Sequence, residues 1–394
     1  MKVVTTNISA ELKAMQPMLG RGGDLQASHC YFIEADMDTG VSITAMNFSV
    51  GMKMKVFGQV AQPGKFVAPV EIADLLAGAA VVTLDVNGAN TLQIKVDKSF
   101  DGKLKGLPSE EYPPIPQMKR LENQFKLSVE AFEQLLGVAQ YADRHTAGKI
   151  IEGLKLSWRQ ASGKHKDFKI SALAADGSVA AVTVVSGKGS AGGEVIIPAQ
   201  SAATLQKFAA YVPDGEWITV GLEKSSLCVK TKETQAWVTV MPGQYPDIGE
   251  LFQGQPDMVG KLELGSLIAQ MKIAHALVRS AETHRAGLTF SPQGIKIAVT
   301  SQERGSGTAQ VACETHSQLT IEKGFGVPLL LSALDALKRI TGECIIQLGN
   351  YQDRRKPLFI KAQTDQGQVT VLVLPMVDID RSPMGAQSEN RSVP

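Results

Sequence analysis

The hydrophobic residues of the chain follow two spacings, one typical of helices and one typical of strands. Phe132, Leu135, Leu136 and Ala139 fall at offsets of three, four and seven, which places them on one face of a helix. Comparable patterns predict further helices over 8–19 and 266–278, and after Pro69, Pro198 and Pro328, each of which follows a short β-branched or aromatic run. Alternating hydrophobic and polar positions on both sides of a turn predict β-hairpins at 81–96, 217–231 and 344–362.

The same succession of elements occurs three times along the chain. A proline opens a predicted helix at Pro69, Pro198 and Pro328, which are 129 and 130 residues apart, and the fixed φ of proline suits a helix start. A hairpin and one more strand follow each helix, and the strand ends in Leu-Pro or Met-Pro at 107–108, 241–242 and 374–375. Chance similarity of α+β patterns is the alternative, but the agreement in order and spacing favours a threefold repeat.

The repeat predicts three domains of similar size. Their expected bounds are 1–121, 122–257 and 258–377, with proline-bearing linkers at 109–120 and 243–257. Residues 378–394 form a polar tail that is expected to be disordered.

Composition describes an ordinary globular protein of 394 residues with a formal net charge of +1. No stretch of 18 apolar residues is present, and the first residues lack a signal-peptide pattern, so a cytoplasmic location is expected. The four cysteines are far apart without metal-ligand spacing and are expected to be reduced thiols. A net charge near zero means that any nucleic-acid contact must come from locally arranged basic residues.

No catalytic pattern emerges from the sequence. The segment SGKGSAGG at 186–193 lacks the spacing of a phosphate-binding loop, and HExxH does not occur. We therefore expect no enzyme activity, no cofactor and no metal, although an enzyme with a dispersed site is a third possibility.

Several motifs, taken in order, resemble the bacterial sliding clamp family, the beta subunit of DNA polymerase III. They are GKFVAP followed by LL at 64–76, LPSEEYP at 107–113, GQYPDI at 243–248, LSALDALKRITGE at 331–343 and LVLPM at 372–376. The resemblance implies an α+β fold of three clamp domains, each with two helices packed on antiparallel sheets. It also implies a head-to-tail homodimer that closes a ring around duplex DNA, a contact that physics permits for repeated units.

Basic residues on or beside the predicted helices could meet phosphates in such a ring without reading bases. Most surface lysines are simply solvated, so the set argues more strongly than any member. The predicted DNA-binding residues are Lys13, Arg21, Arg144, His145, Lys149, Lys207, Lys272, Arg279, Arg285, Lys338 and Arg339.

The resemblance further implies a hydrophobic pocket that binds linear peptides of a DNA polymerase, a clamp loader and other partners. The corresponding positions are Ile151, Ala175, Gly177, Ser178, Val179, Ala180, Pro246, Leu251, Leu372, Leu374, Pro375 and Met376. A strand packed in its own core is the plainer alternative for 372–376. Two departures from the family affect the partners: Ser178-Val179 stands where the family has His-Arg, and 18 residues follow Met376.

Leu104, Leu277 and Val278 resemble the family's dimer-interface positions, although ordinary core residues would look the same. The leading hypothesis is a divergent DNA sliding clamp, a processivity factor in DNA replication. The alternative is a protein-interaction scaffold, built from the same repeats, that no longer loads on DNA.

Overall fold

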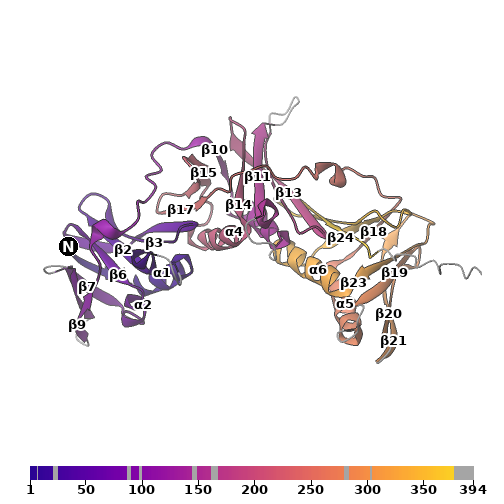
Figure 1. Ribbon diagram of the computed structural model, residues 1–394, viewed down its shortest axis with the longest axis horizontal. Coiled ribbons are helices and arrows are strands. Elements are labelled where there is room, and N and C mark those ends of the chain that lie inside the picture. The colour runs from indigo at the N-terminus through magenta and orange to yellow at the C-terminus, as the bar shows by residue number, and fades with distance from the viewer. Residues whose placement is uncertain are drawn as a thin grey trace, which may run out of the picture. The chain divides into compact units, whose positions relative to one another are not determined.

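The computed structural model describes residues 1–6, 8–20, 25–86, 90–96, 100–143, 149–160, 167–278, 284–301 and 304–376. These residues form two compact units (Figure 1). Unit 1 contains Met1–Gln253, Ala336–Gly342 and Ala362–Val371, and unit 2 contains Gly254–Asp335, Glu343–Lys361 and the chain from Leu372. The three-domain boundaries stay a prediction, and the expected tail at 378–394 lies outside the described residues.

Unit 1 begins with a five-stranded antiparallel sheet in the order β5-β1-β7-β8-β9. Its strands are β1 Lys2–Thr6, β5 Gly58–Gln62, β7 Val81–Val86, β8 Thr91–Val96 and β9 Phe100–Lys105. The pairing of β7 with β8 confirms the first predicted hairpin. Within the described part of unit 1, β9 has a strand neighbour on one side only.

A second run of antiparallel strands crosses unit 1 in the order β6-β2-β3-β4-β17-β16-β15-β10. Its members are β2 Cys30–Asp36, β3 Gly40–Met46, β4 Val50–Val56, β6 Gly64–Pro69, β10 Glu122–Leu127, β15 Ile218–Glu223, β16 Ser226–Lys230 and β17 Thr234–Thr239. Strand β10 continues into the order β13-β12-β11-β14. The bounds of these strands are β11 Gly153–Gln160, β12 Phe168–Ala175, β13 Val179–Gly189 and β14 Gly193–Pro198.

Helices cover the sheets of unit 1 with one apolar face. They are α1 Ile8–Met15, α2 Ile72–Leu75, α3 Val129–Gly137 and α4 Ala199–Leu205. Ser128 caps α3, because its side chain accepts a hydrogen bond from the Ala131 N–H. The predicted helical face of Phe132, Leu135, Leu136 and Ala139 is buried, as the spacing indicated. Figure 1 shows α4 beside β14 and β11.

The helix predicted after Pro69 is short. It spans only Ile72–Leu75, and Gly78, with a φ of +77°, has a backbone conformation that ends helices. The run before the proline forms β6, which pairs with β2 and buries Phe66, Val67 and Ala68. Pro198 likewise ends a strand, β14, and is the N-cap of α4.

Unit 2 contains the antiparallel sheet β21-β20-β19-β23 and a pairing of β18 with β22 and β24. The strands are β18 Met258–Glu263, β19 Arg285–Ser291, β20 Gly294–Ser301, β21 Gly305–Val311, β22 Glu314–Thr315, β23 Ile321–Gly326 and β24 Ile345–Asn350. Helix α5 spans Leu264–Val278. Helix α6 Val327–Thr341 and strands β25 Leu358–Gln363 and β26 Gly367–Val373 contribute residues to both units.

The segment Ala362–Val371 is tied to unit 1 by buried polar contacts. The Gln134 Nε2 donates to Thr183 Oγ1 at 2.8 Å, and Thr364 Oγ1 donates to Gln134 Oε1 at 2.6 Å. The Thr183 hydroxyl in turn donates to the Gln368 carbonyl at 3.0 Å. A buried amide satisfied at both ends fixes the register of this segment on α3 and β13.

No helix in the described residues is both long and apolar enough to span a bilayer.

The join between β4 and β17 provides a test of the fold. Gly51 on β4 faces the indole of Trp237 on β17, and a Cβ built on Gly51 would overlap this ring. Because Trp237 is only 3% exposed and cannot move aside, we expect Gly51→Ala to lower the unfolding free energy by about 1–3 kcal/mol. Urea unfolding monitored by circular dichroism measures this effect.

Gly287→Ala is the matched control, because it also places a methyl group on a strand. The nearest atom to that Cβ lies at 3.7 Å, an ordinary contact. Equal losses of stability in the two variants would contradict the close approach at Gly51.

Candidate nucleic-acid and peptide interfaces

Three predicted basic residues of unit 1 lie exposed on or beside short helical segments. Lys13 is exposed on α1, whose Ile8, Leu12 and Met15 are buried on the opposite face. Lys207 is exposed on the 3₁₀ turn Gln206–Tyr211 that follows α4. Lys149 is exposed directly before the 3₁₀ turn Ile150–Glu152. The backbone of each lysine is thus part of a helical segment or directly adjoins one, and its side chain reaches water.

Lys207 also borders a polar hollow of about 470 Å³ in unit 1. Asn47, Ser49, Gln200 and Thr204 line it together with Lys207. Neutral hydrogen-bonding groups around one ammonium are suited to phosphate oxygens, which accept from both kinds of donor.

The basic residues of α6 differ in their exposure. Arg339 is exposed and its Nη1 donates to the Gln140 Oε1 at 2.7 Å, a contact within unit 1. Lys338 is half-buried. This hydrogen bond uses one nitrogen of the Arg339 guanidinium group. Because the side chain is exposed, the rest of the group still presents its charge to solvent.

Two predicted basic residues of unit 2 contact other residues of the chain. The Lys272 Nζ lies 3.6 Å from the Asp335 Oδ1, which offsets its charge. Arg285 is half-buried over Gly324, where a Cβ would meet the guanidinium group. Four further predicted residues, Arg21, Arg144, His145 and Arg279, lie outside the described residues.

The predicted peptide-pocket residues of unit 1 centre on the turn between β12 and β13. The Asp176 Oδ1 accepts from the N–H groups of Ser178 and Val179 at 2.8 and 2.7 Å. Gly177 has a φ of +89°, which only glycine adopts without strain. Gly177 and Ser178 are exposed at the tip of this turn, and the two hydrogen bonds hold its backbone in place.

Three neighbours of this turn belong to the core of unit 1. Ala175, Val179 and Ala180 are 5%, 5% and 8% exposed, so their side chains offer little surface to a ligand. Ile151 is half-buried, whereas Pro246 and Leu251 are exposed. The sequence reasoning missed Tyr245, which is buried and fixes the linker from inside. The repeated Tyr-Pro pair at 112–113 and 245–246 was the available signal.

The predicted pocket residues of unit 2 alternate between core and surface. Leu372 is 3% exposed, whereas Leu374 and Met376 are each 43% exposed. The Met376 N–H donates to the Gly324 carbonyl at 2.9 Å, so the segment continues beside β23 after β26 ends. Two large apolar side chains and a proline are thus presented on ordered backbone.

The three predicted dimer-interface residues have different surroundings. Leu104 is half-buried on the edge strand β9. Leu277 is half-buried and its Cδ1 covers Gly307 of β21. Val278 is fully buried and packs in the core of unit 2.

Taken together, the elements define an α+β protein of mostly antiparallel sheets in which exposed helices carry basic residues. No model of a protein family matches the sequence, and no curated protein matches it. Solved structures do match.

The structural likeness is to bacterial sliding clamps. The beta subunit of DNA polymerase from Streptococcus pyogenes matches with a TM-score of 0.83 and 17% identity, over 95% of this chain and 100% of that one. The DNA polymerase sliding clamp from Bacillus subtilis gives 0.83 and 18%, over 96% and 99%. The DNA polymerase III beta subunit from Thermotoga maritima gives 0.81 and 14%, over 95% and 99%. The chain therefore has the sliding-clamp fold.

Lys323 on β23, beside the strand end that carries Met376, allows a pH test. Its side chain is 3% exposed and its Nζ donates to the Lys356 carbonyl at 2.8 Å. Burial lowers the pKa of Lys323 from 10.5 to about 8, although Asp353 and Asp257 oppose the shift. Between these two pH values the unfolded chain binds more protons than the folded chain, so the contribution of Lys323 to stability rises with pH.

We expect the unfolding free energy of the native chain to rise relative to that of Lys323→Met between pH 8 and pH 10. Urea unfolding of both proteins at pH 7, 8, 9 and 10 measures it. A difference that stays constant over this range would mean that the amine keeps the same pKa in both states.

Proposed function

We propose that this chain is a DNA sliding clamp, a non-catalytic processivity factor that tethers a replicative polymerase to duplex DNA. The observation that carries the proposal is the likeness of fold to proteins named as DNA polymerase beta subunits and sliding clamps. It extends over 95–96% of this chain at TM-scores of 0.81–0.83 in the three comparisons given above.

We propose further that two copies close head to tail into a ring. Strand β9 of unit 1 and strand β21 of unit 2 each end a sheet in the described residues. Exposed edges of this kind invite pairing with another chain, and a head-to-tail contact closes when its rotation completes a circle. The sequence GSGTAQV of β21 carries no charge, so it would not repel Lys103 and Lys105 on β9.

The ring would hold DNA by weak contacts to phosphates. Lys13, Lys149, Lys207 and Arg339 are exposed, while Lys272, Arg285 and Lys338 are less available. A small number of such contacts gives a modest, salt-dependent attraction without base readout. This suits a protein that must stay linked to DNA and still slide.

Partner peptides of the polymerase and clamp loader would bind through Leu374, Pro375 and Met376. Methionine adapts to apolar side chains of different shape, and a few buried anchors supply most of the energy of such contacts. The role of the pocket residues predicted in unit 1 stays a prediction.

Topological retention on DNA tests the ring. The protein is mixed with linear duplex that carries biotin at both ends, and streptavidin is then added to block the ends. A closed ring should stay on blocked duplex through gel filtration in high salt and run off an unblocked duplex. Equal retention on both would contradict the proposal, and a dimer that ignores DNA would favour the interaction-scaffold alternative.

The same assay tests the predicted helix lysines. Lys13→Glu, Lys149→Glu and Lys207→Glu combined should reduce threading onto DNA at low salt by about tenfold or more, because phosphate contacts set the salt-dependent affinity. The matched control combines Lys95→Glu, Lys126→Glu and Lys224→Glu, which change three exposed lysines of strands or turns. Equal effects of the two triple variants would show that only net charge matters.

The peptide site is tested with Met376→Ala and a fluorescent peptide from the C-terminus of the replicative polymerase of the same organism. Loss of an exposed anchor should weaken peptide binding by about tenfold, measured by fluorescence polarisation, while light scattering shows an unchanged dimer. Met37→Ala is the control, because Met37 is also an exposed methionine, at 64%, but lies in the turn between β2 and β3 of unit 1. Unchanged binding in Met376→Ala would remove Met376 from the site.

A further inference from the structure

One face of the sheet in unit 1 gathers charged residues from strands that are far apart in sequence. In the strand register, Glu34 on β2 stands opposite Lys65 on β6 and Ser42 on β3, and Ser42 stands opposite Lys55 on β4. The adjacent row runs from Phe32 through Thr44 and Lys53 to Gln235 on β17. Side chains in these two rows point to the same side of the sheet.

The linker after β9 builds a wall over this face. The Tyr112 ring stacks on Phe32 with centroids 4.9 Å apart and an interplanar angle of 21°. The Tyr112 hydroxyl donates to the Thr44 carbonyl at 3.3 Å. Pro113, Ile115 and Pro116 then border a cavity of about 390 Å³, a volume in the range of small-ligand sites.

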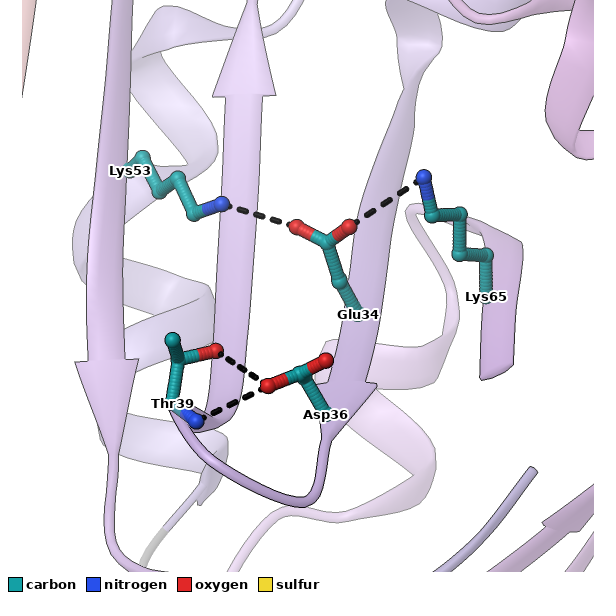
Figure 2. A network of polar contacts seen from close by, with 5 residues as sticks. All are labelled: Glu34, Asp36, Thr39, Lys53 and Lys65. Carbon is teal, nitrogen blue, oxygen red and sulfur yellow. Dashed lines mark hydrogen bonds and ion pairs between the residues drawn. The ribbon is translucent and has the colours of Figure 1, made fainter. Parts of the chain in front are cut away.

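Glu34 holds two ammonium groups in place at the floor of the cavity (Figure 2). The Lys53 Nζ lies 2.8 Å from its Oε2, and the Lys65 Nζ lies 3.2 Å from its Oε1. Burial raises the pKa of Glu34, but the hydrogen bonds and charges of Lys53 and Lys65 outweigh it and hold the pKa below its usual value. Glu34 is thus ionised at neutral pH and fixes both lysines.

Lysines outnumber carboxylates in the lining of the cavity. Lys53, Lys55 and Lys65 line it, with Glu34 as the one carboxylate among its lining residues, and Lys55 also lies 3.7 Å from Glu233 outside the lining. Each ammonium group has three N–H donors, so one bond to Glu34 leaves Lys53 and Lys65 with further donors. Lysines whose positions are already fixed lose little freedom when an anion binds.

We propose that this cavity binds an acidic segment of a partner protein, with a carboxylate on Lys53 and Lys65 and an adjacent apolar side chain on Pro113, Ile115 and Pro116. Charge selects the carboxylate and the linker wall selects an apolar neighbour. The site shares no residue with the peptide site proposed around Met376, so it is independent of that assignment.

The lining argues for a peptide over a nucleotide. Phe32 and Tyr112 cover each other and are 7% and 8% exposed, so neither offers a free face on which a base could stack. The described lining residues include no arginine, the side chain that pairs with phosphate through two parallel hydrogen bonds.

The test uses a fluorescein-labelled peptide of eight residues in which aspartate and leucine alternate. Its counterpart with asparagine in place of aspartate controls for apolar binding. The double variant Lys53→Gln, Lys65→Gln should weaken binding of the acidic peptide by about tenfold, as measured by fluorescence polarisation. Lys95→Gln is the control, because the Lys95 side chain is as exposed as that of Lys65, at 55%, and is also paired with a carboxylate, Asp101, at 3.6 Å.

Amide hydrogen exchange of the native protein gives a second readout that needs no variant. The acidic peptide should protect the linker at 109–117 and the strands β2 and β4. Protection elsewhere would overturn the proposal, as would equal binding of both peptides, or equal affinity in the native chain and the lysine variant. Displacement of the peptide by equimolar inorganic phosphate or ADP would show a small-anion site and overturn it as well. Retained binding in Met376→Ala separates this site from the one proposed for polymerase peptides.

Discussion

The antiparallel pairing of β4 with β17 is the contact on which the organisation of unit 1 depends. It joins strands that are about 180 positions apart in the chain, from Met54 opposite Thr234 to Val50 opposite Val238. Trp237 fits against Gly51 at this join and belongs to a buried cluster with Phe32, Tyr112 and Met118. Because the linker after β9 packs on that cluster, the join also determines where the linker lies over the sheet.

Two turns of unit 1 share their backbone hydrogen bonds but differ in the side chains beside them. The Asp36 Oδ1 accepts from the N–H groups of Asp38 and Thr39, and the Asp176 Oδ1 accepts from the N–H groups of Ser178 and Val179. Two positions before the aspartate stands Glu34 in the first case and Ala174 in the second. Glu34 supports a charged cavity, and Ala174 is buried without charge. Turns of the same geometry can therefore stand beside different chemistry.

Local patterns predicted the local elements well. The helical faces of α3 and α5 and the hairpins follow from spacing alone, because burial on one side imposes that spacing. Contacts between distant segments could not be foreseen. Lys272 was predicted to contact DNA, but Asp335 from another helix lies 3.6 Å from its ammonium group, a contact that the local pattern does not reveal. The cavity around Glu34 is built from five strands and a linker, which no window of sequence contains.

The polar contacts that hold Ala362–Val371 on unit 1 bear on how the chain could be divided. Gln134 and Thr183 are 5% and 0% exposed and find their partners on Thr364 and Gln368. A fragment ending in the linker after Phe252 would lack these partners. The side chains of Gln134 and Thr183 would then be exposed to water or left without hydrogen-bond partners. Unit 1 is thus completed by residues synthesised more than a hundred positions later, so its final structure forms only once nearly the whole chain has left the ribosome.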